Sequence, residues 1–283
     1  MKTRSKAFLV LPLILLLCSC SGEKLLNAFV PKTGYRIYKD IAYGSDPRQE
    51  MDIYVPDGLK RPVCTVLFFY GGRWTDGDRG LYRFAGEALS SKGCVTAIAD
   101  YRVYPKIRYP VFMEDSAKAF VFLHRHAAEY GGDPERLYLA GHSAGAYNAV
   151  MLAVHPTFLK NAGGQPAWVR GVIGISGPYD FLPFTDADVI DIFSTETGAA
   201  TQPITYVRKG LPPMLLVTGD ADTEVKPKNT RNMAAKLQEA GNPVTVRIYP
   251  GIYHEAMVLS LLHGFRGKTP LLHDIATFIK EHP

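Results

Sequence analysis

One serine in this sequence is flanked in the way that a nucleophile requires. Ser143 lies in the run Gly141-His142-Ser143-Ala144-Gly145, which matches the pattern Gly-x-Ser-x-Gly. An apolar stretch precedes this run and an alanine-rich stretch follows it, as in a strand–turn–helix nucleophile elbow. Glycines permit a strained turn that exposes the serine hydroxyl at the N-terminus of a helix, where the helix dipole favours negative charge. The pattern therefore predicts that Ser143 attacks an electrophilic carbon.

A serine hydroxyl needs a base at neutral pH, and the base needs an acid that holds its tautomer. Of the eight histidines, His254 has the best position for the base, because it lies in a loop just beyond the last expected strand. Asp220 and Asp222 both follow another strand at the same sheet edge. We favour Asp222, with Asp220 as the alternative, since one of the two aspartates could instead cap the loop.

The tetrahedral intermediate of such a reaction also needs fixed N–H donors for its oxyanion. We expect one donor at the backbone of Ala144, directly after the serine. The others are expected in Gly71-Gly72-Arg73, because this run follows an apolar strand and its glycines allow the backbone to approach a substrate closely. The spacing thus predicts an oxyanion hole assembled from two distant segments.

A substrate pocket is expected beside these residues. Residues 178–210 are irregular and contain several proline, threonine and acidic residues, which predicts a small lid or pocket wall. The aromatic residues Trp74, Phe181 and Phe184 are candidates for lining the pocket. Plain packing remains an alternative role for each of them.

These residues need a scaffold that brings them to one edge. Strand-like and helix-like stretches alternate without a linker or a repeat. The expected strands are 35–43, 49–55, 63–70, 95–101, 137–140, 169–176, 214–218 and 244–249, and the expected helices are 79–91, 115–130, 144–154, 228–240 and 271–280. This alternation predicts an α/β fold with a mostly parallel central sheet covered by helices on both faces. Reactive loops of such a sheet gather at the carboxyl ends of its strands.

The composition fits one large folded domain behind an export signal. The chain has 283 residues, of which 47% are hydrophobic and 21% charged, so it can bury a core and is not disordered. The net charge of +5 includes three positive charges in the first six residues. The sequence has no basic run elsewhere that would suggest a nucleic-acid surface. We expect a signal peptide over 1–20, a tether over 21–34 and the catalytic domain over 35–283.

The leader resembles that of a bacterial lipoprotein. Residues 7–17 form an apolar run that is short for a membrane span. The run ends in Leu17-Cys18-Ser19-Cys20, which resembles a lipobox with Cys20 as the lipid-carrying residue. An ordinary cleaved signal and a retained anchor are the alternatives. We therefore expect export to the periplasm or outer membrane of a bacterium, with membrane contact only through the lipid.

Two further cysteines, Cys64 and Cys94, lie near the starts of expected strands. An oxidising compartment permits a disulfide between them. We favour instead two buried thiols that behave as small apolar side chains.

Taken together, the motifs resemble those of the carboxylesterases related to hormone-sensitive lipase and kynurenine formamidase, a group that includes bacterial feruloyl-esterase-like hydrolases. The motifs are Tyr70-Gly71-Gly72-Arg73-Trp74, Asp100-Tyr101-Arg102, Tyr109-Pro110, Gly132-Asp133-Pro134, Gly141-His142-Ser143-Ala144-Gly145, Gly219-Asp220-Ala221-Asp222 and His254. The resemblance covers roughly residues 35–283 and implies an α/β-hydrolase fold with no cofactor and no metal.

The resemblance also implies roles for single residues. It places Ser143, Asp222 and His254 on the catalytic triad of that group. Gly72, Arg73 and Ala144 fall on its oxyanion donors, and Gly71 shapes the loop. This chain departs from the usual His-Gly-Gly sequence, because Tyr70 stands at the first position. We expect the tyrosine hydroxyl to brace the loop in place of the histidine.

The function expected from these observations is that of an exported carboxylesterase acting on short acyl esters or on acetyl or feruloyl groups linked to carbohydrate. Its partner would be a small-molecule or carbohydrate ester, with no nucleic acid. An N-formyl amide hydrolase or a peptidase on the same fold is the first alternative. A non-catalytic binding protein is an alternative of another class.

Overall fold

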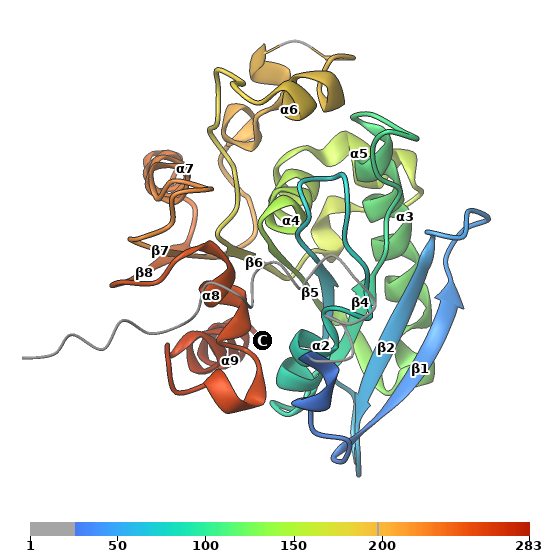
Figure 1. Cartoon of the computed structure of the whole chain (residues 1–283). Helices are drawn as coiled ribbons and strands as arrows, with labels where there is room; N and C mark the ends of the chain where they lie inside the picture. The colour runs from blue at the N-terminus through green and yellow to red at the C-terminus, as the bar shows by residue number, and fades with distance from the viewer. Residues whose placement is uncertain (1–25, 197) are drawn as a thin grey trace, which may run out of the picture.

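An eight-stranded sheet forms the centre of the molecule (Figure 1). The computed structural model describes residues 26–196 and 198–283. The strands are β1 (Tyr35–Ala42), β2 (Glu50–Pro56), β3 (Val63–Phe69), β4 (Val95–Ala99), β5 (Gly132–His142), β6 (Gly171–Ile175), β7 (Met214–Gly219) and β8 (Val244–Tyr249). Their order is β1-β2-β4-β3-β5-β6-β7-β8. The β1–β2 and β2–β4 pairs are antiparallel and all other pairs are parallel, which confirms the mostly parallel sheet.

Helices cover both faces of this sheet. The α-helices are α2 (Arg83–Ser90), α3 (Val111–His126), α4 (Ala144–Val154), α5 (Pro156–Asn161), α6 (Ala187–Ile192), α7 (Lys228–Glu239), α8 (His254–Leu259) and α9 (Leu271–Glu281). Short 3-10 helices span Ala127–Tyr130, Pro166–Trp168, Gly198–Thr201, Pro203–Tyr206 and His263–Phe265. In Figure 1, α3, α4 and α5 lie on one side of the sheet and α2 and α9 on the other.

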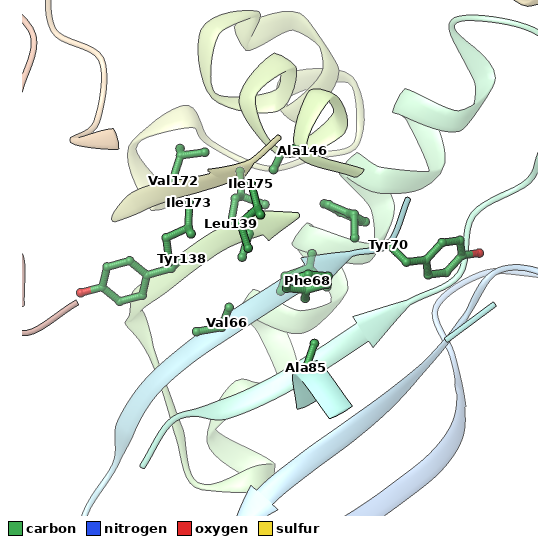
Figure 2. Close-up of a cluster of buried hydrophobic side chains, with 14 of the residues drawn as sticks. Val66, Phe68, Tyr70, Ala85, Tyr138, Leu139, Ala146, Val172, Ile173 and Ile175 are labelled. Carbon is green, nitrogen blue, oxygen red and sulfur yellow. The ribbon is translucent and has the colours of Figure 1, made fainter. Parts of the chain in front are cut away.

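The central strands are buried on both faces, which explains their nearly continuous apolar sequences. Val66 and Phe68 of β3, Leu139 of β5 and Ile173 of β6 have no exposed surface. Figure 2 shows these side chains packed together across neighbouring strands. This core makes β5 a rigid support for the residue that follows it.

Several element boundaries differ from those expected, and two of these differences have a clear physical cause. The α3 helix begins at Val111 rather than 115, because Pro110 stands at its N-cap, where a missing N–H costs nothing. The β5 strand begins at Gly132 rather than 137, because Gly132 pairs with Val63 of β3. The pairing of Gly132 with Val63 joins residues far apart in the chain, so local periodicity does not reveal it.

The expectation of two free thiols is wrong. Cys64 and Cys94 form a disulfide, and their Cα atoms are 4.7 Å apart. The β3 and β4 strands are parallel neighbours in which Thr65 pairs with Val95, so the preceding cysteines stand side by side. A Cα separation in this range suits a disulfide, and only the strand order creates it.

The described end of the expected tether packs against the domain. Residues 26–28 are helical, and the side chains of Leu26 and Val30 are buried. Within residues 26–196 and 198–283, no helix is both long and apolar enough to cross a membrane. The expected signal peptide and Cys20 lie outside the described residues.

Candidate active site

The turn between β5 and α4 holds Ser143 in the conformation expected of a nucleophile elbow. Ser143 has φ 55° and ψ −122°, a strained region for a residue with a side chain. The glycines on either side are required by close contacts. A Cβ at Gly141 would lie 2.2 Å from the carbonyl oxygen of Gly145, and a Cβ at Gly145 would lie 2.1 Å from that of Phe69. The sequence pattern is therefore a steric consequence of this tight turn.

The structure brings Ser143, His254 and Asp222 together from the ends of three strands. His254 Nε2 lies 2.8 Å from Ser143 Oγ, and His254 Nδ1 lies 2.8 Å from Asp222 Oδ2. All three side chains are buried. Asp220, the alternative acid, instead accepts a hydrogen bond from the backbone N–H of Gly251 at 2.6 Å. Asp222 is thus the aspartate that contacts the histidine, and Asp220 caps the neighbouring loop.

The second carboxylate oxygen of Asp222 is held by the backbone. Asp222 Oδ1 accepts hydrogen bonds from the N–H groups of Glu224 at 3.1 Å and Val225 at 2.9 Å. These bonds fix the carboxylate so that Oδ2 faces His254. Burial lowers the pKa of His254, but the hydrogen bond and charge of Asp222, with the charges of Glu224 and Glu255, raise it above the ordinary 6.5. The site therefore favours a protonated imidazole more than water does.

Three backbone N–H groups beside Ser143 are available for an oxyanion. Within the described part of the chain, the N–H groups of Gly72, Arg73 and Ala144 donate no hydrogen bond. Gly71 differs, because its N–H donates to the hydroxyl of Tyr82 at 3.2 Å. The broader expectation of donors along the whole run 71–73 does not hold for Gly71, whose N–H is occupied, and the loop-shaping role that the resemblance implied for Gly71 fits this contact.

A hydrogen-bonded chain that the sequence did not indicate joins this loop to His254. The Tyr82 hydroxyl accepts from Gly71, so it donates to His142 Nδ1 at 3.0 Å. His142 Nε2 then carries the proton and donates to the carbonyl oxygen of His254 at 3.3 Å. Burial and the nearby His254 lower the pKa of His142 well below its ordinary value, so it stays neutral. His142, which is next to Ser143 in the sequence, thus connects Tyr82 to the backbone of His254.

Tyr70 braces the loop through an arginine. Its hydroxyl accepts a hydrogen bond from Arg48 Nη2 at 2.8 Å, and the same nitrogen donates to the carbonyl oxygen of Gly77 at 2.7 Å. The Tyr70 ring stacks on Tyr101, with 4.8 Å between ring centroids. The expected bracing role of Tyr70 therefore has a structural basis, and Arg48 carries it to the far end of the loop.

The aromatic residues expected at the pocket border a cavity of about 330 Å³ that opens beside Ser143 and Ala144. Phe181 and Phe184 are half-buried in its wall and belong to the expected lid segment. Trp74 also lines this cavity but is almost entirely buried, and its Nε1 donates to the buried Asn148 at 3.0 Å. The tryptophan therefore both packs the core and shapes the pocket.

A second cavity of about 250 Å³ opens on the other side of Ser143, against His254. Leu26 and Glu255 are among its lining residues, and no sequence motif pointed to either. Among the described residues, no group of three or more histidine, cysteine or acidic side chains has the geometry of a metal site.

Comparisons with known proteins identify a family and several relatives of this chain. The BD-FAE family model matches residues 51–237. A protein of Oryza sativa subsp. japonica named "Probable isoprenylcysteine alpha-carbonyl methylesterase" is 30% identical over 94% of this chain and 68% of its own length. A protein of the same name from Arabidopsis thaliana is 28% identical over 92% of this chain. The chain spans 60% of the length of that relative.

A solved structure shares the fold. The truncated form of a carbohydrate esterase from gut microbiota superimposes with a TM-score of 0.77 at 20% identity, over 89% of this chain and 98% of its own. This likeness confirms the expected α/β-hydrolase fold. Because the family model matches well over half of the sequence, this chain belongs to the BD-FAE family of α/β-hydrolase proteins.

Proposed function

We propose that this chain is a serine esterase that hydrolyses carboxylic esters through an acyl-enzyme on Ser143. The observation that carries the proposal is the unbroken contact from Ser143 Oγ to His254 Nε2 and from His254 Nδ1 to Asp222, each at 2.8 Å. The names of the relatives, which are esterases, support the same reaction class. The carboxylesterases that the sequence motifs resemble use a serine, a histidine and an aspartate in the same chain positions.

The first half-reaction transfers the acyl group to the enzyme. Ser143 Oγ attacks the ester carbonyl carbon while His254 Nε2 takes the hydroxyl proton. The N–H groups of Gly72, Arg73 and Ala144 donate to the oxyanion that forms. The intermediate then collapses, the bond to the alcohol oxygen breaks, and His254 returns the proton to that oxygen as the alcohol leaves.

The second half-reaction restores the enzyme. A water molecule gives a proton to His254 Nε2 while its oxygen attacks the acyl carbon. The same N–H groups hold the second oxyanion. When this intermediate collapses, Ser143 Oγ leaves and recovers its proton from His254, and the carboxylic acid is released.

The proposed substrates are esters with short acyl groups or with acetyl or feruloyl groups linked to carbohydrate. The aromatic wall formed by Trp74, Phe181 and Phe184 supports a flat or short acyl group. The name of the structural neighbour, a carbohydrate esterase, supports the carbohydrate class. An N-formyl amide hydrolase remains an alternative to be included in the substrate screen.

The direct test is hydrolysis of p-nitrophenyl acetate by the wild type and by Ser143→Ala. We expect the variant to lose activity by at least about 10³-fold, because the nucleophile is removed. A fluorophosphonate probe should label the wild type at Ser143 and leave the variant unlabelled. Equal activity of the two proteins, or no labelling of the wild type, would refute the proposal.

We also propose that the protein is exported and lipid-anchored at Cys20. The leader sequence supports export, and so does the Cys64–Cys94 disulfide, because disulfides persist in oxidising compartments. We expect the wild type expressed in bacteria to incorporate radiolabelled palmitate and the Cys20→Ala variant to lose this incorporation. Incorporation that is unchanged in the variant would contradict the assignment of Cys20.

A further inference from the structure

The two cavities beside Ser143 differ in which catalytic groups they touch. The cavity of about 330 Å³ is lined by Ser143 and Ala144 but not by His254. The cavity of about 250 Å³ is lined by Ser143 and His254 but not by Ala144. The serine therefore stands at the border between two spaces, and a bound ester has to place one part in each.

The chemistry of the proposed reaction indicates which cavity holds the alcohol part of the ester and which holds the acyl part. His254 Nε2 must return its proton to the alcohol oxygen, so the alcohol has to lie beside His254. We call the cavity lined by His254 the leaving-group cavity. The acyl group then extends into the other space, the acyl cavity. This assignment rests on the proposed function and uses no further assumption.

The walls of the leaving-group cavity are apolar. They are formed by the side chains of Leu26, Leu81, Phe84, Val258 and Leu259. Leu26, Phe84 and Val258 are buried. Cavities of roughly 150 Å³ lined by such side chains hold a benzene ring. A space of about 250 Å³ therefore suits an alcohol with one aryl ring or a short alkyl chain.

The charged groups around this cavity are mostly acidic. Asp76, Glu224 and Glu255 belong to its lining. The single cation among the described lining residues, Arg73, forms an ion pair with Asp186 at 2.8 Å. An anionic alcohol would thus meet three carboxylates with no unpaired cation to offset them. The acyl cavity differs, because Lys226 and Lys228 line it together with Asp186 and Glu224.

We infer that the leaving-group cavity selects esters of uncharged alcohols with a small apolar body and discriminates against anionic alcohols. Of the proposed substrates, esters of small hydrophobic alcohols therefore fit this cavity better than carbohydrate-linked esters, and esters of acidic sugars do not fit it. The acyl cavity, with charges of both signs, imposes no such selection. Glu255 borders only the leaving-group cavity and Lys228 only the acyl cavity, so the two sides can be varied separately.

The test uses two pairs of esters that differ in one carboxylate. The alcohol-side pair is the acetate ester of methyl 4-hydroxyphenylacetate and that of 4-hydroxyphenylacetate, whose phenols are nearly equal as leaving groups. The acyl-side pair is 4-methylphenyl hexanoate and the 4-methylphenyl monoester of adipic acid. We expect kcat/KM to favour the neutral member about tenfold in the alcohol-side pair, from repulsion at short range. The acyl-side pair should differ by less than about threefold.

Two single-charge variants, one at each cavity, complete the design. Glu255→Gln should reduce the preference in the alcohol-side pair about threefold, whereas Lys228→Gln should leave it unchanged. Ratios within one variant cancel any effect on His254. A discrimination that appears in the acyl-side pair, or that Lys228→Gln alone changes, would overturn the assignment while leaving the esterase proposal intact. If neither neutral ester is hydrolysed, the proposed function fails and the assignment fails with it.

Discussion

Replacing Asp222 with asparagine tests the orientation of the proposed base. The shape of the side chain is preserved, but one oxygen becomes an amide group that donates. The oxygen at the Oδ1 position accepts from the N–H groups of Glu224 and Val225, and these donors need an acceptor. The amide nitrogen must therefore stand at Oδ2, facing His254 Nδ1. The histidine then carries its proton on Nε2, where it cannot accept a proton from Ser143.

The magnitude follows from the alternative orientation. Flipping the amide would restore the productive tautomer but leave the two N–H groups without an acceptor, at about 1–3 kcal/mol each. The total cost of the flip is therefore about 2–6 kcal/mol. At equilibrium, the fraction of molecules with the productive tautomer is then between roughly one in 30 and one in 10⁴. Loss of the Asp222 charge weakens the imidazolium further. We expect kcat/KM to fall by about 10³–10⁴-fold.

The assay is kcat/KM for p-nitrophenyl acetate at pH 8, with urea unfolding to confirm that Asp222→Asn is folded. Asp220→Asn is the matched control, because Asp220 contacts the backbone of Gly251 and not His254. We expect this control to stay within about threefold of the wild type. A loss of less than about 30-fold in Asp222→Asn, or an equal loss in the control, would refute the reasoning about the amide orientation.

Two further predictions concern pH and the disulfide. The acidic limb of kcat/KM should lie above pH 6.5, because activity is lost as the pH falls through the raised pKa of His254. Glu224→Gln with Glu255→Gln should move this limb to lower pH, since fewer negative charges stabilise the imidazolium; an unmoved limb would contradict the cause assigned to the shift. Replacing Cys64 and Cys94 with alanine should lower the free energy of unfolding by about 3–4 kcal/mol, given their sequence separation of 30. Urea unfolding with and without dithiothreitol measures this effect, and a reductant that leaves the wild type unchanged would argue against the disulfide.

The sequence predicted the residues that the structure brings together because their surroundings are local. Gly141 and Gly145 mark a turn that only glycines allow, and the strand and helix on either side of Ser143 have clear apolar patterns. His254 and Asp222 follow strands, and parallel strands deliver the residues after them to one edge. These signals need no knowledge of which strands are neighbours.

Other features depend on contacts between distant segments. The Tyr82–His142 chain joins a loop after β3 to the elbow, and nothing in the sequence near Tyr82 marks it as part of the site. For the same reason the sequence did not show that the hydroxyl of Tyr82 occupies the N–H of Gly71. The longer β5 strand likewise depends on the pairing of Gly132 with Val63.

The nucleophile elbow, the order of the three proposed catalytic residues and the alternation of strands and helices follow from short spacings along the chain. Three other features follow from the folding of the whole chain: the aspartate that faces His254, the pairing of Cys64 with Cys94, and the position of Ser143 between two cavities of different character. Those outcomes depend on distances between residues 30 or more positions apart, which strand order and helix packing set and local patterns do not.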